Sequence, residues 1–331
     1  MTLRTATRPR VSLVLLAYNQ ESTVRRAVQS CFAQDCEPLE LVLSDDASSD
    51  GTFDVLQQLA ADYRGPHTVR ARRSATNVGI GEHYNQLLNA TSGELLVTAA
   101  GDDFSVPHRV RRLIDAWEAT GCRADLIASH VIDMDHDGQL HEVMRVDDLS
   151  KYRNVHDWAA KRPYIIGAGH AFTRRMMERF GPMLASVFYE DQIMVFRAIA
   201  MGGAVTVDEP LVHYRRGGTS RKPAFESDEH MQRWTHRQRG RELAEMEQLV
   251  ADATVAGCDA LVRPTLEAPF RRERYLRAMQ GAGNREERWR AFRTATALPF
   301  GWRLRKMLHV QFPDATRAVR SVLSVFHHRR R

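Results

Sequence analysis

Asp45-Asp46-Ala47-Ser48-Ser49-Asp50-Gly51-Thr52 follows the apolar segment 39–44, which has the composition of a buried strand. A second acidic pair, Asp102-Asp103, follows another apolar segment at 94–100. Because ligands bind at the carboxyl ends of the strands in an open α/β sheet, we expect both pairs to line one crevice. Facing carboxylates repel one another unless a cation or hydrogen-bond donors lie between them. The sequence therefore predicts a site for a metal ion and a phosphorylated ligand.

Strand-like and helix-like segments alternate over the first 130 residues. Apolar runs predict strands, and apolar residues at helical spacing predict helices between them. The expected strands are 11–17, 39–44, 67–71, 95–99 and 124–129, and the expected helices are 21–34, 52–62, 82–90 and 106–120. This alternation predicts an α/β fold with a mostly parallel sheet and right-handed connections.

The pattern changes after about residue 131. We expect a turn at 135–138, helices at 174–180 and 191–201, short strands at 204–207 and 211–214, and a glycine loop at 215–220. Beyond residue 225 only helical patterns occur, at 231–256, 259–280, 285–297 and 315–326. The chain is therefore expected to contain an α/β domain at 1–224 and a helical region at 225–331.

The bulk composition is that of a folded, basic protein of 331 residues. Hydrophobic residues make up 43%, enough for a sizeable core, and the net charge is +6. A basic surface suits nucleic acid, anionic lipid or an acidic substrate, and a solvated Arg-rich face is the simpler alternative. Basic residues are not interleaved with aromatic residues along a strand, so we expect no nucleic-acid partner.

Cysteine usage and hydropathy favour a cytosolic protein. Cys31, Cys36, Cys122 and Cys258 form no C-x-x-C pair and have no matching His pair, so they are expected to be reduced thiols rather than zinc ligands. The apolar run at 11–17 is too short for a signal peptide and lacks a cleavage site. No segment reaches the ~18 apolar residues that would span a bilayer.

Common phosphate-binding loops are absent from the sequence. Residues 17–21 lack G-x-G-x-x-G, and G-x-x-x-x-G-K-[ST] does not occur, so a phosphate must be held by a metal ion and side chains. Asp103 is the candidate metal ligand, since Mg²⁺ or Mn²⁺ takes one or two carboxylates with water and phosphate oxygens. Asp102 would bind a ribose hydroxyl or take a second metal position. The alternative for both is a solvated turn.

Residues beside the first two strands are candidates for contact with a nucleobase. Asp45 and Asp46 can accept a hydrogen bond from a ring N–H, and Tyr18 and Asn19 can face the base. The alternative is turn chemistry, in which a neighbouring residue such as Asp50 caps the next helix.

Three further groups are candidates for catalysis or phosphate contact. Glu190-Asp191 begins a helix and can supply a general base, although acidic residues there also complement the helix dipole. His213 lies near the end of a strand, where a packed histidine is the common alternative to a ligand. Arg216 belongs to a basic glycine loop that either closes over a phosphate or is a solvated loop.

Taken together, these stretches resemble the family 2 inverting glycosyltransferases, which have the GT-A fold. The resemblance runs from about residue 11 to residue 220, roughly two thirds of the chain. It rests on the order and spacing of six short stretches: 11–19, 45–52, 77–79, 93–94, 101–103 and 190–191. The histidine that relatives often carry after a Tyr-Arg pair is missing from 214–217, and His213 is the nearest candidate.

The resemblance implies a nucleoside-diphosphate sugar donor of UDP or dTDP type, a divalent metal (Mn²⁺ or Mg²⁺) and a hydroxyl acceptor. It implies Asp191 as the base with Glu190 beside it, and Asp103 with His213 at the metal. The implied donor-binding residues are Ala17, Tyr18, Asn19, Glu21, Asp45, Asp46, Asn77, Gly79, Asp102 and Arg216. The acceptor would attack the anomeric carbon opposite the departing diphosphate, which inverts its configuration.

The resemblance also bears on partners and location. Family acceptors are often growing cell-surface polysaccharides on lipid carriers, so we expect a glycan or lipid-linked acceptor and a cytoplasmic enzyme of bacterial polysaccharide or glycolipid synthesis. The basic tail, with its apolar stripe at 319–326, suits peripheral contact with the inner face of the membrane. A packing helix or an oligomer contact is the alternative for this tail.

Two other functions compete with transfer. A sugar nucleotidylyltransferase usually has a glycine-rich basic loop after its first strand, and residues 18–21 are not such a loop. A non-catalytic homologue that binds a nucleotide sugar or a glycan would not need both Asp103 and Asp191.

Overall fold

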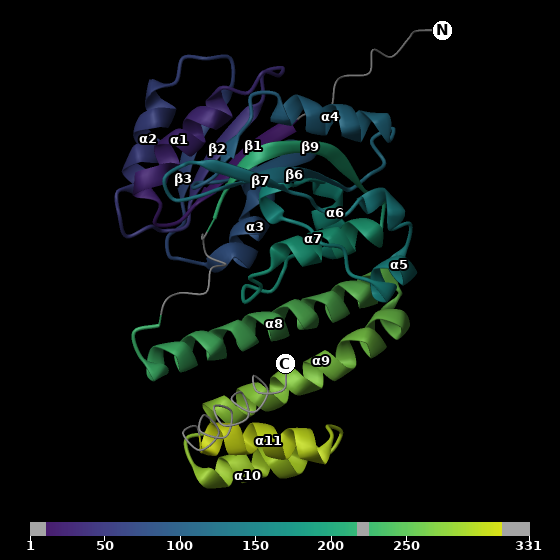
Figure 1. Cartoon of the computed structure of the whole chain (residues 1–331). Coiled ribbons are helices and arrows are strands. Elements are labelled where there is room, and N and C mark those ends of the chain that lie inside the picture. Colours follow the sequence, from purple (N-terminus) through teal and green to yellow (C-terminus); the bar gives the residue numbers. More distant parts are fainter. Residues whose placement is uncertain (1–10, 217–224, 313–331) are drawn as a thin grey trace, which may run out of the picture. The chain divides into compact units, whose positions relative to one another are not determined.

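A nine-stranded mixed sheet forms the centre of the computed structural model, which describes residues 11–216 and 225–312 (Figure 1). The strand order is β3-β2-β1-β4-β8-β6-β9-β5, and β7 pairs with β6. The strands are β1 (Val11–Ala17), β2 (Glu40–Asp45), β3 (Thr68–Arg73), β4 (Leu95–Ala100), β5 (Phe104–Ser105), β6 (Leu126–Met134), β7 (Leu140–Met144), β8 (Ala171–Thr173) and β9 (Ala204–Arg215).

Strands β3, β2, β1 and β4 run parallel to one another, as the alternating pattern predicts. The other half is more mixed than the expected mostly parallel sheet, because β8 runs antiparallel to both β4 and β6, and β5 antiparallel to β9. Strand β9 replaces the two short strands expected at 204–207 and 211–214. It continues through them beside β6 with two register shifts, and these irregularities include Pro210.

Helices cover both faces of the sheet (Figure 1). On one face α1 (Glu21–Phe32), α2 (Thr52–Asp62) and α4 (Arg109–Ala119) share a core with alternate strand residues such as Leu13 and Leu41. On the other face lie α3 (Gly79–Ala90), α6 (Arg174–Phe180) and α7 (Glu190–Ile199). Short helices α5 (Val155–Ala160), η1 (Leu149–Lys151) and η2 (Gly167–Gly169) lie in the connections.

The C-terminal part consists of helices α8 (Asp228–Ala256), α9 (Asp259–Gly281), α10 (Arg285–Thr294) and α11 (Phe300–Gln311). Helix α11 was not predicted, and the helix expected at 315–326 lies outside the described residues. Tyr275, Met279, Phe292 and Met307 belong to the core of this part. No helix among the described residues is both long enough and apolar enough to cross a membrane.

The chain divides into two compact units, but not simply at residue 224. One unit is Met1–Pro223 with Glu247–Val262, and the other is Ala224–Met246 with Arg263–Arg331. The end of α8 belongs with the sheet because Asp252 forms a fully buried ion pair with Arg197 of α7, at 2.7 Å. Gln248 also accepts a hydrogen bond from the backbone of Leu184 at 2.7 Å.

Candidate active site

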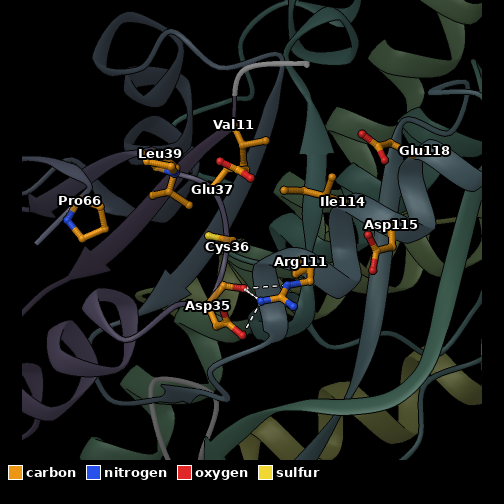
Figure 2. Close-up of a pocket in the computed structure, with 11 residues that line it drawn as sticks. Val11, Asp35, Cys36, Glu37, Leu39, Pro66, Arg111, Ile114, Asp115 and Glu118 are labelled. Atoms are coloured by element: carbon orange, nitrogen blue, oxygen red, sulfur yellow. Dashed lines mark hydrogen bonds and ion pairs between the residues drawn. The ribbon is translucent and has the colours of Figure 1, made fainter. Parts of the chain in front are cut away.

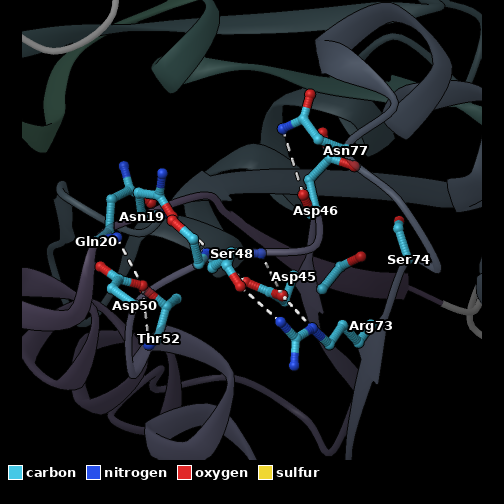
Figure 3. Close-up of polar contacts among 12 residues, drawn as sticks. Asn19, Gln20, Asp45, Asp46, Ser48, Asp50, Thr52, Arg73, Ser74 and Asn77 are labelled. Atoms are coloured by element: carbon cyan, nitrogen blue, oxygen red, sulfur yellow. Dashed lines mark hydrogen bonds and ion pairs between the residues drawn. The ribbon is translucent and has the colours of Figure 1, made fainter.

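The loops after β1 and β2 interlock at the carboxyl edge of the sheet (Figure 3). Ala17 and Asp45 are paired across the two strands, so the residues that follow them meet. The Asn19 amide N–H donates to Ser48 Oγ at 2.9 Å, and Asn19 Oδ1 accepts from the Ser49 amide at 2.8 Å. Asn19 has φ +52°, a left-handed conformation that asparagine tolerates better than most residues.

Asp45 is fully buried and organises the acidic loop that contains it. Its carboxylate accepts hydrogen bonds from the Ser48 amide at 3.0 Å and from the Ser48 hydroxyl. Arg73 of β3 forms an ion pair with the same carboxylate at 3.3 Å. These contacts fix the turn in which Ala47 has φ +57°.

Asp46 joins this loop to the start of α3. Its two carboxylate oxygens accept the backbone N–H groups of Val78 and Gly79, both at 2.9 Å. Asn77 donates to the Asp46 carbonyl at 3.3 Å. A carboxylate at a helix N-terminus satisfies otherwise unpaired N–H groups and is favoured by the helix dipole. The structure thus brings together three residues that the sequence assigned to donor binding.

The loop after β4 meets the first two through Gln20 and Gly101. A Cβ atom on Gly101 would lie 2.4 Å from Gln20 Oε1 and 3.1 Å from the Ala17 side chain, so the loops approach closely here. Thr23 of α1 donates to the Gly101 carbonyl at 2.9 Å. Glu21, expected to bind the donor, accepts the Gly51 amide at 3.0 Å and so supports the acidic loop. Tyr18 is exposed above these contacts.

Asp103 is buried beside Asp102 at this edge. Burial raises the pKa of Asp103 well above its ordinary value, and the neighbouring Asp102 carboxylate adds to the rise. Asp103 Oδ1 accepts the backbone N–H of Arg215 at 2.7 Å, which ties the loop to the end of β9. Burial also raises the pKa of Asp102. A cation beside the pair would stabilise the ionised carboxylates and so offset the free-energy cost of burying them.

The fit of a divalent metal depends on these two carboxylates. Within 11–216 and 225–312, no three His, Cys, Asp or Glu side chains are grouped so as to hold a metal ion. Mg²⁺ or Mn²⁺ in a phosphate site needs only one or two carboxylates, so Asp102 and Asp103 suit that mode. His213 pairs across the strands with Phe104. Burial and then the Arg26 charge lower its pKa, and its role as a ligand stays a prediction.

The two arginines that end β9 have different contacts. Arg215 donates to the Asp102 carbonyl at 3.2 Å and to the His136 carbonyl at 2.9 Å, so it braces the acidic loop. Arg216, expected to bind the donor, instead places its guanidinium on the Asp133 carboxylate of β6, with Nε at 3.0 Å. Its donor contact stays a prediction, and the glycine loop from 217 lies outside the described residues.

Glu190 and Asp191 form the first turn of α7. Burial raises the pKa of Glu190 to about 8, and the adjacent Asp191 charge contributes. Gly167 lies against this pair, because a Cβ atom there would be 2.8 Å from Glu190 Oε1. The Asp191 carboxylate accepts the Gln192 amide at 2.7 Å, as a helix-start residue would. At neutral pH this pair retains a proton, which suits proton transfer.

Two buried residues that the sequence did not single out, Arg109 and Tyr84, interact with acidic residues of the site. Arg109 of α4 donates to the carbonyls of Thr98 and Ala168 at 2.7 and 2.8 Å. Burial lowers its pKa to about 10, and Asp103 opposes this shift. Burial and then the Glu190 charge raise the pKa of Tyr84 of α3. No local sequence motif marks either residue, since each lies in an amphipathic helix among several other polar residues.

A separate pocket of about 670 Å³ lies at the opposite edge, near the amino ends of β1 and β2 (Figure 2). Val11 and Leu39 line it together with acidic residues and Arg111, which pairs with Asp35. Burial raises the pKa of the Cys36 thiol to about 11, so this cysteine is a poor nucleophile at neutral pH. The pocket contains none of the candidate active-site residues.

Comparison with known protein families and sequences gives consistent matches. The profile of glycosyl transferase family 2 matches residues 12–181. EpsE of Bacillus subtilis is 32% identical over 106 residues, which cover 32% of this chain and 37% of EpsE. The succinoglycan biosynthesis protein ExoO of Rhizobium meliloti is 29% identical over 233 residues, 64% of this chain and 63% of ExoO. The matches thus span less than two thirds of either relative.

Solved structures share the fold at low sequence identity. TarS of S. aureus aligns with a TM-score of 0.56 and 15% identity, over 88% of this chain and 49% of TarS. The mannosyltransferase PcManGT from Pyrobaculum calidifontis, in complex with GDP-Man and Mn²⁺, aligns with a TM-score of 0.52 and 19% identity, over 95% of this chain and 88% of that structure. These likenesses confirm the expected GT-A fold.

Proposed function

The chain belongs to glycosyl transferase family 2, and from this membership we propose that it moves a sugar from a nucleoside-diphosphate sugar to a hydroxyl acceptor with inversion. One observation carries the proposal. Acidic loops far apart in sequence, at Asp45-Asp46 and Asp102-Asp103, lie at the same carboxyl edge of parallel strands. Buried Arg109 donates to the carbonyls of Thr98 in β4 and of Ala168, and Gly167 next to Ala168 lies against Glu190.

The donor would bind over the interlocked loops. Tyr18, Asn19 and Asp46 would surround the base, with Asp45 supporting the loop, and Asp102 would lie by the ribose. A structural neighbour of this chain was solved with UDP-GlcNAc and another with GDP-Man, which supports a nucleotide-sugar donor in general. We propose a UDP or dTDP sugar for this chain.

Different residues of the chain would act on the leaving group and on the nucleophile. Asp103, with Asp102 beside it, would hold Mn²⁺ or Mg²⁺; when bound, this ion neutralises charge on the departing diphosphate. Asp191 would accept the proton of the attacking hydroxyl. Glu190, protonated at neutral pH because of its raised pKa, would leave Asp191 as the ionised member of the pair. Attack opposite the leaving group inverts the anomeric configuration.

The proposed acceptor is supported by a relative, and the proposed location by the sequence of the C-terminal part. ExoO is named for succinoglycan biosynthesis, which favours a glycan or lipid-linked acceptor in polysaccharide or glycolipid synthesis. We propose a cytoplasmic protein with peripheral contact at the inner face of the membrane, through its C-terminal part at 225–331. Oligomer formation through the same part is the alternative.

Two substitutions test the assigned roles. Asp103→Asn should abolish Mn²⁺-dependent binding of the nucleoside diphosphate in titration calorimetry, and it should also abolish transfer. Asp191→Asn should keep that binding and lose transfer, measured as nucleoside diphosphate released across a panel of nucleotide sugars. Asp137→Asn, in an exposed turn, is the matched control and should change neither.

Three results would contradict the proposal. Full transfer by Asp191→Asn would remove Asp191 from the role of base. Metal-dependent binding that survives Asp103→Asn would move the metal elsewhere. Tight binding of a nucleotide sugar by the unmodified protein, with no turnover of any donor or acceptor in the panel, would favour a non-catalytic binding protein.

A further inference from the structure

Helix α11 exposes large apolar side chains in the C-terminal unit. Phe300 and Leu308 of α11 and Phe312 directly after its end are all exposed. Phe300 is 62% exposed, the highest value among the large apolar side chains of the described residues. Met307 is packed in the core of this unit, and the partly buried Leu304 packs against the same core. The helix is therefore already folded and still presents apolar surface.

Trp289 of α10 adds to this exposed apolar surface. Its ring lies 5.5 Å from that of Phe292, which lies 5.6 Å from that of Phe300. Phe292 is buried, whereas Trp289 is 43% exposed. Of the twelve exposed large apolar side chains in the described residues, four lie between 289 and 312. We call Trp289, Phe300, Leu308 and Phe312 the α10–α11 face. Exposed apolar side chains gathered in this way usually mark an interaction site.

The charge around this face is strongly positive. Residues 285–312, which contain α10 and α11, include seven Lys or Arg residues and two Glu residues. Arg290, Arg293 and Arg305 are exposed, and Arg290 pairs with Glu286 at 3.7 Å. Residues 263–331 contain 17 of the 47 basic residues and 5 of the 41 acidic ones, a net charge of +12 against +6 for the whole chain. The positive charge is therefore local to the end of the chain that contains the face.

We propose that the α10–α11 face binds an anionic lipid surface. Helices that lie in a membrane interface combine Phe, Leu and Trp on one side with Lys and Arg beside them. Tryptophan favours the headgroup level, and basic side chains are attracted by anionic headgroups. This deepens the membrane contact proposed above and names a surface for it outside the predicted tail helix at 315–326.

Sedimentation of the full-length protein with vesicles tests the face. Vesicles of phosphatidylglycerol and phosphatidylcholine should sediment the protein, and pure phosphatidylcholine vesicles should not. Phe300→Ser with Leu308→Ser should weaken partitioning at least about tenfold, because the inserted groups are lost. Arg293→Gln with Arg305→Gln should weaken it about fivefold per charge and reduce its salt sensitivity.

A control variant and an activity measurement separate membrane binding by the α10–α11 face from the transfer reaction. Leu140→Ser with Val143→Ser removes exposed apolar side chains from β7 and should sediment like the unmodified protein. Hydrolysis of a nucleotide sugar without acceptor should be equal in all variants. Undiminished sedimentation of the Phe300→Ser, Leu308→Ser variant would overturn the proposal in favour of another lipid-binding segment. No vesicle binding together with a dimer that this variant abolishes would overturn it in favour of a second copy as the partner.

Discussion

Replacing Glu190 with glutamine should change how the stability of the protein depends on pH. The folded chain raises the pKa of this carboxyl from 4.5 to about 8, first by burial and second through the adjacent Asp191 charge. Gly167 lies so close to this carboxylate that a Cβ atom would be 2.8 Å from Glu190 Oε1. Glutamine has nearly the same shape and no charge.

The sign of the effect follows from proton linkage. Below pH 4.5 Glu190 is protonated in both the folded and the unfolded state, so it has little effect on their balance. Between pH 4.5 and about 8 only the unfolded chain loses the proton, so the free energy of unfolding falls as pH rises. At about 1.4 kcal/mol per pKa unit, the full loss is at most about 4–5 kcal/mol above pH 8. Glu190→Gln removes this loss.

Urea unfolding at pH 5.0 and pH 8.5 measures the difference. The gain in unfolding free energy of Glu190→Gln over the unmodified protein should grow by about 3 kcal/mol or more between these pH values. Glu178→Gln, at an exposed position of α6, is the control and should show no such growth. Parallel pH profiles for the unmodified protein and Glu190→Gln would refute the buried, protonated carboxyl on which the assignment of Asp191 as base depends.

Three further substitutions test contacts that support the site. Asp252→Ala should lower the free energy of unfolding by about 3–5 kcal/mol, measured in urea, because it leaves Arg197 buried without its carboxylate. Ala47→Gly should raise it by about 0.5–1 kcal/mol, since φ is +57° and glycine relieves left-handed strain at some cost in chain entropy. Gly81→Ala should raise the KM for the donor and lower thermal stability, because its Cβ would lie 2.7 Å from the Leu184 carbonyl at the start of α3.

The elements at the candidate site could largely be predicted from local pattern. Strand β1 and helices α2 and α6 have the expected bounds, because apolar runs and helical stripes there are bounded by turn residues. Asp50 accepts the Thr52 amide at 3.1 Å, which agrees with its expected role at the start of α2. The common edge of the two acidic pairs follows from strand direction alone, and the pairing of Ala17 with Asp45 confirms the relation between the first two strands.

Contacts that depend on distant strands could not be predicted. The link between Asp103 and the Arg215 amide requires β9 to pass the β4 loop, 112 residues later in the sequence. Arg216 was expected at the donor, but its partner Asp133 is selected by the pairing of β6 with β9. Helix α11 was missed because its basic residues, Arg303 to Lys306, were considered only as charge. Its exposed apolar side chains can be told from the packed ones, Leu304 and Met307, only in the structure.

The acidic residues of the edge differ in how their charge is compensated. This difference distinguishes residues that hold the loops in place from residues that take part in the reaction. Asp46 accepts two backbone N–H groups, and Asp45 accepts two donors from Ser48 and an ion pair from Arg73. Such carboxylates are stabilised by the fold itself and hold the loops in place. For Asp103 and Glu190, removal from water first and a neighbouring carboxylate second instead raise the pKa of each. Carboxyl groups whose pKa is raised in this way are typical of sites that bind a cation or a proton. We therefore expect substitutions at Asp45 to act mainly on stability and those at Asp103 mainly on transfer.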